Sequence, residues 1–484
     1  MKNIFLLLLS ILCFTASVFT QNIGIGTATP AFKLDVKNGS INTDSVYRIG
    51  GNRVLSASLA NTFVGIGAAN SITTGDYNTA VGKEAFYSNT TGERNTALGL
   101  WALYSNTSGY YNTGVGKSAL HLNSNGDANA AYGYEALYYN TSSFNTAVGY
   151  HAMLFNTGGY QNTASGYEAL TRNTTGYFNT AIGSQSLLFN TTGTRNSATG
   201  TKALYSNSLG HYNTANGYGA LYGNTQGTYN TAHGYQALYS NGFGDYNTAC
   251  GTETLYSNTD DRNTALGYKT LYSNTTGFQN TGVGYYTLVN NITGDNNTTI
   301  GSFSDVSSAD LSNATALGYA TQVDASNKVR IGNASVTSIG GQVGWSNFSD
   351  GRYKQNIQED VPGILFINKL RPVTYTVDSK SLDENYYKLK PGIGSSTNDP
   401  YRHTGFIAQE VERSATELGF TFSGVDKPQQ PDGLYGLRYA DFVVPLVKAV
   451  QEQQQQINHL QVEIELLKEQ NKLLIQLLNK MNRE

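Results

Sequence analysis

A repeat of 17 residues fills the middle of this 484-residue chain and restricts its fold more than any other feature. The Asn of an Asn-Thr-Ala-x-Gly motif, or a close variant, recurs from Asn61 to Asn297, with two steps of 16 residues among the steps of 17. A unit of this length is too short for a pair of helices, and it contains two Gly-bearing turn signals. Each repeat is therefore predicted to form one coil of a mainly β, elongated solenoid, with two short strands per coil and about fifteen coils.

The residues inside each repeat predict which side chains are buried. The recurrent Ala-Leu pair, as in Ala102-Leu103, is expected to point inward, and the repeated Asn residues are expected to stack as ladders between coils. No proline occurs between Pro30 and Pro362, which agrees with a ladder that needs every backbone N–H. The inward set of one coil is small, so we expect several chains to share the core.

The composition excludes some classes of function. Only 13% of the residues are charged, 53 are Gly, and the net charge is -3, which is typical of a repetitive extracellular β protein and argues against nucleic-acid binding. Beyond the N-terminal segment, Cys250 is the single cysteine, so no intrachain disulfide is expected. It takes the repeat position of Val81, Leu98 and Ile182, which predicts a buried filler.

The N-terminus has the pattern of a secretory signal. Met1-Lys2-Asn3 is followed by an apolar run from Ile4 to Phe14 and then by small and polar residues up to Gln21. This run is too short for a membrane span. We therefore expect export, to a bacterial cell surface or the extracellular medium, with no membrane span in the mature chain.

Shifts in composition predict the domain boundaries. After Trp345, charges, prolines and mixed helix and strand patterns replace the repeat, which indicates a small α+β domain. The predicted order is a signal peptide at 1–20, a strand-rich cap at 21–60, the solenoid at 61–301, a modified β-roll or neck at 302–344, the α+β domain at 345–442 and a coiled coil at 443–484.

The last segment carries a heptad pattern. The a positions are Val443, Val450, Ile457, Ile464, Asn471 and Leu478, and the d positions are Leu446, Gln453, Leu460, Leu467, Leu474 and Met481. β-Branched residues at a with Leu at d favour two strands on local rules, and Asn471 would fix the register.

Three motifs in the C-terminal part carry a resemblance to a known family. They are the run from Trp345 through Ser349 and Lys354 to Ile357, the stretch 405–411 (GFIAQEV), and the stretch 439–452 that begins YAD. In this order they resemble the endosialidase-type C-terminal chaperone, the self-cleaving domain of phage tailspikes and of certain membrane-bound transcription factors. The resemblance covers residues 345–484.

The resemblance implies that this domain forms a homotrimer, helps three upstream chains fold into one fibre, and then cuts itself off. It assigns Ser349 as the nucleophile and Lys354 as its base, with the cut at Phe348-Ser349 or Ser349-Asp350. A Ser–Lys pair is chemically suited to this step, because a lysine whose pKa is lowered by burial can take the serine proton. Asp350 and Arg352 either orient the site or form a surface ion pair.

Several alternatives remain open from the sequence. The fibre could retain its chaperone domain uncut, or it could bind or degrade surface polysaccharide, since Tyr recurs twice in many repeats, as in Tyr218 and Tyr222. The acids of the repeats stand singly, which argues against glycoside cleavage. Asn, Tyr or Ser stand where calcium-binding repeats carry Asp, so no metal and no cofactor is expected. The thin coils and the resemblance favour three chains, whereas the heptads favour two.

Overall fold

The computed structural model describes strand backbones at 23–25, 34–36, 46–49 and 52–58, and then residues 60–385, 401–429 and 433–483. The chain divides into two compact units, residues 1–161 and residues 162–484. Both units contain coils of a parallel β-solenoid of about 16 turns, which confirms the predicted repeat fold. The predicted signal peptide at 1–20 lies outside the described residues.

The first unit begins with short strands in the predicted cap region and continues into the repeats. Strand β1 (Ile23–Ile25) pairs in parallel with β2 (Leu34–Val36), while β3 (Val46–Ile49), β4 (Asn52–Ser58) and β5 (Asn61–Val64) form an antiparallel set. From β5 onward each strand pairs in parallel with the strand one repeat later. These strands are β6 (Thr79–Val81), β7 (Thr96–Leu98), β8 (Thr113–Val115), β9 (Ala130–Tyr132) and β10 (Thr146–Val148).

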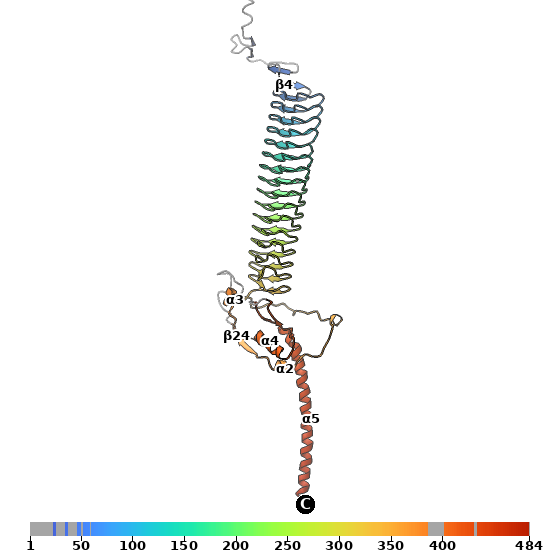
Figure 1. Ribbon diagram of the computed structural model, residues 1–484, viewed down its shortest axis with the longest axis vertical. Helices are drawn as coiled ribbons and strands as arrows, with labels where there is room; N and C mark the ends of the chain where they lie inside the picture. Colours follow the sequence, from blue (N-terminus) through green and yellow to red (C-terminus); the bar gives the residue numbers. More distant parts are fainter. Residues whose placement is uncertain are drawn as a thin grey trace, which may run out of the picture. The chain divides into compact units, whose positions relative to one another are not determined.

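One repeat, residues 95–111, shows how a coil is built. Strand β7 points its central residue, Ala97, into the coil, because successive side chains of a strand face opposite sides. Ala102 and Leu103 enter from the opposite wall, and all three side chains are fully buried. The predicted inward fillers are therefore correct. Figure 1 shows the strands of successive coils stacked in register.

Three residues of this coil adopt the left-handed backbone conformation that side chains usually avoid. They are Trp101 (φ 58°), Leu103 (φ 51°) and Tyr111 (φ 59°), and equivalent positions recur in the other repeats. Trp101 and Leu103 bend the wall that carries Ala102, so one three-residue strand forms per repeat instead of the predicted two. This wall still bonds to the next coil, because Leu103 N donates to Ala119 O at 2.9 Å.

The first Asn of each repeat forms a buried ladder. Asn95 N donates to Asn78 Oδ1 of the preceding coil at 2.9 Å, and Asn95 Nδ2 donates to Gly109 O at 2.8 Å. Asn95 Oδ1 accepts in turn from Asn112 N at 2.9 Å. Each side chain therefore supplies both the acceptor for one neighbouring coil and a donor to a turn carbonyl.

The second Asn of each repeat forms a parallel ladder. Asn106 Nδ2 donates to Asn89 Oδ1 of the preceding coil at 2.9 Å and to Gly109 O of its own turn at 3.0 Å.

The residue that follows each strand must be Gly, because its backbone conformation and its contact with the next coil leave no room for a side chain. Gly99 has φ 135°, and a Cβ there would overlap the carbonyl of Gly116 in the next coil.

The second unit repeats this construction. Its strands pair in parallel with unshifted register, for example Thr214 with Thr231. The strands are β11 (Thr163–Ser165), β12 (Thr180–Ile182), β13 (Ser197–Thr199), β14 (Thr214–Asn216), β15 (Thr231–His233), β16 (Thr248–Cys250), β17 (Thr264–Leu266), β18 (Thr281–Val283) and β19 (Thr298–Ile300).

Two expectations from the sequence are wrong. Cys250 is exposed rather than buried, because the third residue of each strand faces outward, as do Val81 and Ile182. The small inward set also needs no other chain to cover it, since side chains such as Leu103 and Leu238 are fully buried within a single chain. Thin coils therefore give no argument for a shared core.

The neck continues the solenoid with a changed repeat. Strand β21 (Thr315–Leu317) pairs with β19 and then with β23 (Val329–Ile331), while β20 (Asp305–Val306) pairs with β22 (Gln322–Val323) on a second wall. The predicted two strands per coil thus occur here. These three strand pairings are parallel, as in the repeats, and β23 is the last strand of the solenoid among the described residues.

The C-terminal part is a small α+β fold followed by one long helix. It contains η1 (Gly351–Tyr353), α2 (Ile364–Ile367), β24 (Val373–Tyr375), α3 (Ser379–Asn385), β25 (His403–Gly405), α4 (Ala408–Glu417), β26 (Val425–Asp426), β27 (Gly436–Leu437), η2 (Tyr439–Phe442) and α5 (Val443–Met481). Strands β24 and β25 pair antiparallel, as do β26 and β27. Phe366, Val411, Ala415 and Phe442 form the core. Helix α5 runs 39 residues without interruption (Figure 1).

The Asn ladder can be tested at Asn213, whose Nδ2 donates to Gly227 O at 2.7 Å in a fully buried site. In Asn213→Asp a buried carboxylate would face that carbonyl, so we expect a loss of about 1–3 kcal/mol in local stability. Hydrogen exchange of the peptides covering residues 196–230 should speed up, and the thermal midpoint should fall.

The matched control is Asn216→Asp, three residues along on the outward face of β14. It introduces the same charge without breaking the ladder, so exchange should stay as in the unchanged protein. If the two variants had the same exchange rates and the same thermal midpoint, the buried Asn side chains would have no stabilising role.

Candidate active site

The two residues assigned to cleavage lie on either side of a short turn. Ser349 precedes the 3₁₀ turn η1, and Lys354 is its C-terminal cap, where Lys354 N donates to Gly351 O at 3.2 Å. The turn reverses the chain and brings the two side chains together. Lys354 Nζ donates to Ser349 Oγ at 2.8 Å, which is within the reach required of a base and its nucleophile.

Asp350 and Arg352 hold this turn in place. Asp350 Oδ1 accepts from Arg352 N at 2.9 Å, which caps the turn, and the carboxylate also accepts from Arg352 Nε at 2.9 and 3.1 Å. The hydrogen bonds from the Arg352 side chain, and then from its backbone, hold the pKa of Asp350 below its usual value. Asp350 is therefore ionised at neutral pH and bonded to Arg352, which suits it to fix the turn between Ser349 and Lys354.

The site is open to solvent in the single chain. Ser349 and Lys354 are both exposed, and the neighbouring side chains of Phe348 and Tyr353 are exposed as well. A lysine acts as a base only after losing its proton, and burial away from water is what favours the neutral amine. The single chain thus has the contact between Lys354 and Ser349 but not the burial that would favour a neutral amine.

The second motif, 405–411, lies where β25 ends and α4 begins. Phe406 N donates to the phenol oxygen of Tyr439 at 3.2 Å, so the second motif contacts the third. The backbone of Gly405 packs against this phenol, and a Cβ at this position would overlap the Tyr439 oxygen. Gly405 is therefore required for the close approach of the two segments.

The long helix is tied to the domain through Glu452. Its carboxylate Oε2 accepts from Ile364 N at 2.8 Å, at the start of α2. Glu452 belongs to the third motif, but the sequence offers no signal that its partner lies 88 residues upstream. Two histidines of the C-terminal part lie outside this arrangement. His403 is in strand β25, and His459 is exposed on α5, with Nε2 3.5 Å from Glu463 Oε1.

The heptad positions of α5 are exposed along the whole helix. Val450, Ile457 and Leu460 are each about half exposed, as are the apolar a and d residues that follow. A row of apolar side chains at these positions is buried only against another helix.

Among the described residues no helix is both long and apolar enough to cross a membrane. No cluster of three or more His, Cys, Asp or Glu that could hold a metal ion occurs in this part of the chain either.

Comparison with known protein families gives one match to this part of the chain. Residues 349–420 match the family described as chaperone of endosialidase. The match starts at Ser349 and covers the turn with Lys354, β24, β25 and α4. It ends before η2 and α5. No curated protein matches the chain.

The packing of Gly405 against Tyr439 gives a direct test of how the motifs combine. Gly405→Ala should cost about 1–3 kcal/mol, because the added methyl group overlaps the phenol oxygen. Thermal unfolding followed at 222 nm would report this as a lower midpoint for the helical part of the chain.

Removing the phenol oxygen should make room for the methyl group. In the double variant Gly405→Ala/Tyr439→Phe the nearest remaining atoms are Tyr375 Cε1 at 3.3 Å and Tyr439 Cζ at 3.4 Å from the new Cβ. A shift of a few tenths of an ångström relieves these contacts, so most of the stability should return. Tyr439→Phe alone, which loses the acceptor of Phe406 N, is the reference. A double variant as unstable as Gly405→Ala would exclude this contact as the cause.

Proposed function

We propose that this chain is one subunit of an exported trimeric fibre, and that its C-terminal segment assists assembly and then separates by cleaving the chain at Ser349. The contact between Lys354 Nζ and Ser349 Oγ, at 2.8 Å inside the segment that matches the chaperone family, carries the proposal. The solenoid supplies the fibre. The export step and the surface location rest on the N-terminal pattern at residues 1–20.

The cleavage step uses the residues of the turn. Neutral Lys354 takes the proton of Ser349 Oγ, and the oxygen attacks the carbonyl carbon of Phe348 through a five-membered ring. The C–N bond breaks, the Ser349 amine receives the proton from Lys354, and the Phe348 acyl group is left as an ester on Ser349. Water then hydrolyses the ester to a carboxylic acid and the free hydroxyl.

This geometry also favours one of the two bonds beside Ser349. Attack of Ser349 Oγ on its own carbonyl carbon would require a strained four-membered ring. Within one chain the Phe348-Ser349 bond is therefore the one to be cut, and the released fragment begins with Ser349.

The exposure of the site makes assembly the switch for this reaction. A base must be neutral to take a proton, burial favours the neutral form of an amine, and in a single chain the side chain of Lys354 is exposed. We infer that the association of several chains through α5 is accompanied by enclosure of this turn between them. Cleavage then follows assembly instead of preceding it, which is the order that an intramolecular chaperone requires.

Three chains rather than two are favoured by the last turns of α5. Ile475 and Leu477, which take the e and g positions next to Leu474 and Leu478, are also apolar and exposed. They widen the apolar stripe beyond the narrow a and d seam that suffices for two helices. A third helix buries this wider stripe.

A lectin role for the repeat tyrosines receives less support. The rings of Tyr222 and Tyr239 stack on each other with centroids 4.9 Å apart and an interplanar angle of 5°, and Tyr239 stacks on Tyr256 in the same way. Their faces are covered by neighbouring rings, whereas stacking on a sugar needs a free face.

The cleavage proposal predicts the fragment pattern of the secreted protein. The unchanged chain should give two fragments on a denaturing gel, the smaller one beginning with Ser349 by N-terminal sequencing. Ser349→Ala and Lys354→Ala should each give one uncut chain. Ser346→Ala, in the same exposed segment, is the matched control and should split normally. Splitting of Ser349→Ala at the same bond would show that another protease makes the cut.

The link between assembly and cleavage can be tested on α5. Leu460→Lys places a charge in the d seam, so it should lower the mass found by sedimentation and reduce cleavage at least tenfold. Val462→Lys makes the same change on the opposite face and should do neither. If Leu460→Lys were cut as a monomer, or if the unchanged chain formed a trimer that stayed uncut, assembly would not control cleavage.

A further inference from the structure

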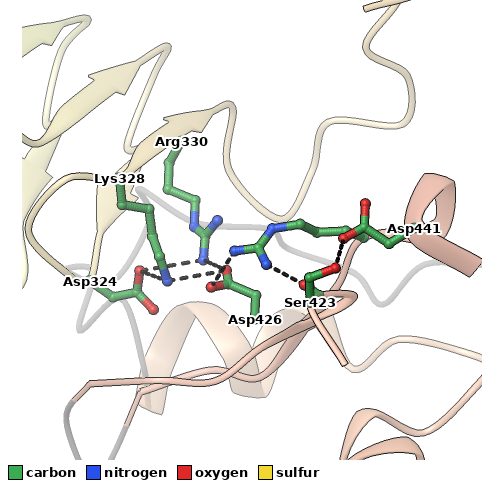
Figure 2. A network of polar contacts seen from close by, with 7 residues as sticks. Asp324, Lys328, Arg330, Ser423, Asp426 and Asp441 are labelled. Carbon is green, nitrogen blue, oxygen red and sulfur yellow. Dashed lines mark hydrogen bonds and ion pairs between the residues drawn. The ribbon is translucent and has the colours of Figure 1, made fainter. Parts of the chain in front are cut away.

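A carboxylate of the C-terminal segment contacts two cations on the last coil of the solenoid. Asp426, at the end of β26, places Oδ2 3.2 Å from Lys328 Nζ and 3.3 Å from an Arg330 nitrogen (Figure 2). The other oxygen, Oδ1, lies 3.3 Å from a guanidinium nitrogen of Arg438, within its own segment. Asp426 therefore joins parts of the chain that are about a hundred residues apart.

A second carboxylate completes the network from the side of the neck. Asp324 Oδ1 lies 3.2 Å from Lys328 Nζ and 3.4 Å from Arg330. We call Asp324, Lys328, Arg330 and Asp426 the ionic clamp. It is shielded from water, since the side chains of Asp324, Lys328 and Asp426 are only 3%, 13% and 16% exposed.

The charges in the clamp depend on each other. Burial acts to raise the pKa of Asp426, but the contacts from Lys328 and Arg330 outweigh it and keep the pKa below its usual value. Asp426 is thus ionised at neutral pH. Separating the C-terminal segment from the neck would break the ion pairs of Asp426 with Lys328 and Arg330. Removing one charged side chain would leave its partners buried without a compensating charge.

The clamp spans the proposed cut without using the peptide bond. Lys328 and Arg330 precede Ser349 in the chain, and Asp426 follows it. The connecting residues 335–360 are exposed throughout and add no buried contact of their own. The clamp cations are also placed by the folded stalk, because Arg330 lies in β23, which pairs with β21 at Ala316.

We propose that the ionic clamp holds the chaperone segment on the end of the folded solenoid after the chain has been cut, so that release requires screening or loss of these charges. The inference rests on the proposed cleavage for its biological setting, but the contact itself can be tested without it. The partner of the stalk end is the chain's own C-terminal fragment.

The test separates cutting from release. The full-length protein is expressed, cleavage is read on a denaturing gel, and retention is read by size-exclusion chromatography at about 0.1 M and about 1 M NaCl, where the Debye length falls from about 10 to about 3 Å. We expect the two fragments to elute together at the lower salt and apart at the higher, because Lys328, Arg330 and Asp426 face water whenever the contact opens and salt then screens the attraction that closes it again. Fragments that separate at the lower salt would overturn the proposal.

Charge removal identifies the clamp as the cause. Asp426→Asn should let the cut fragments separate at about 0.1 M NaCl with at least a tenfold loss in retained fragment. Asp441→Asn removes a carboxylate of the same segment that bonds Ser423 and not the neck, so it should retain the fragment (Figure 2). An unchanged helical signal at 222 nm shows that each variant is folded. Retention by Asp426→Asn equal to that of the unchanged chain would contradict the inference.

A second cut makes the result independent of self-cleavage. Gly340 has open space around it, so a recognition sequence for a site-specific protease can be inserted there in the Ser349→Ala chain. After digestion the two pieces should again stay together at low salt and separate when Asp426 is changed to Asn. If the unchanged chain never cuts itself but these pieces behave as expected, the proposed cleavage fails and the clamp stands.

Discussion

Each coil of this protein depends on hydrogen bonds that its buried Asn side chains make to the coils next to it. An Asn side chain carries both an acceptor and donors, so one residue type can bond the preceding coil, the following coil and a turn carbonyl at once. Asn95 does so through Asn78, Asn112 and Gly109. This requirement fixes the register of the coils, and the register in turn places Gly where backbones meet and Ala or Leu where the interior must be filled.

The solenoid and the C-terminal part differ in how much apolar surface a single chain can bury. The interior of the coils is buried without any partner, whereas the seam of α5 and the turn that carries Ser349 and Lys354 are open to water. Both deficits have the same physical remedy, because association buries the apolar seam and can enclose the lysine. In the proposed function, burial is what couples assembly to cleavage, while the stalk folds as an independent repeat array.

The positions that the sequence misjudged share one cause. The sequence places Cys250 in the interior because Val81, Leu98 and Ile182 take the equivalent repeat position and apolar residues are usually buried. The orientation of a residue in a three-residue strand depends on which neighbour points inward, and here the central Ala takes that place. The predicted second strand of each repeat does not form for a related reason. Leu103 and its equivalents have a left-handed backbone conformation, which is incompatible with a strand.

The sequence by itself determined the repeat, its length, the two Asn ladders, the Ala and Leu interior and the heptad seam, because each follows from periodicity along the chain. Through its resemblance it also pointed to Ser349 and Lys354, five residues apart, which the turn η1 brings into contact. Only the tertiary structure decided what lies outside local periodicity. The pairing of Asp426 with Lys328 and Arg330, and of Glu452 with Ile364, joins residues separated by about ninety to a hundred positions. Such pairs form because folding buries opposite charges and unbonded N–H groups together, and no spacing in the sequence records where that burial occurs.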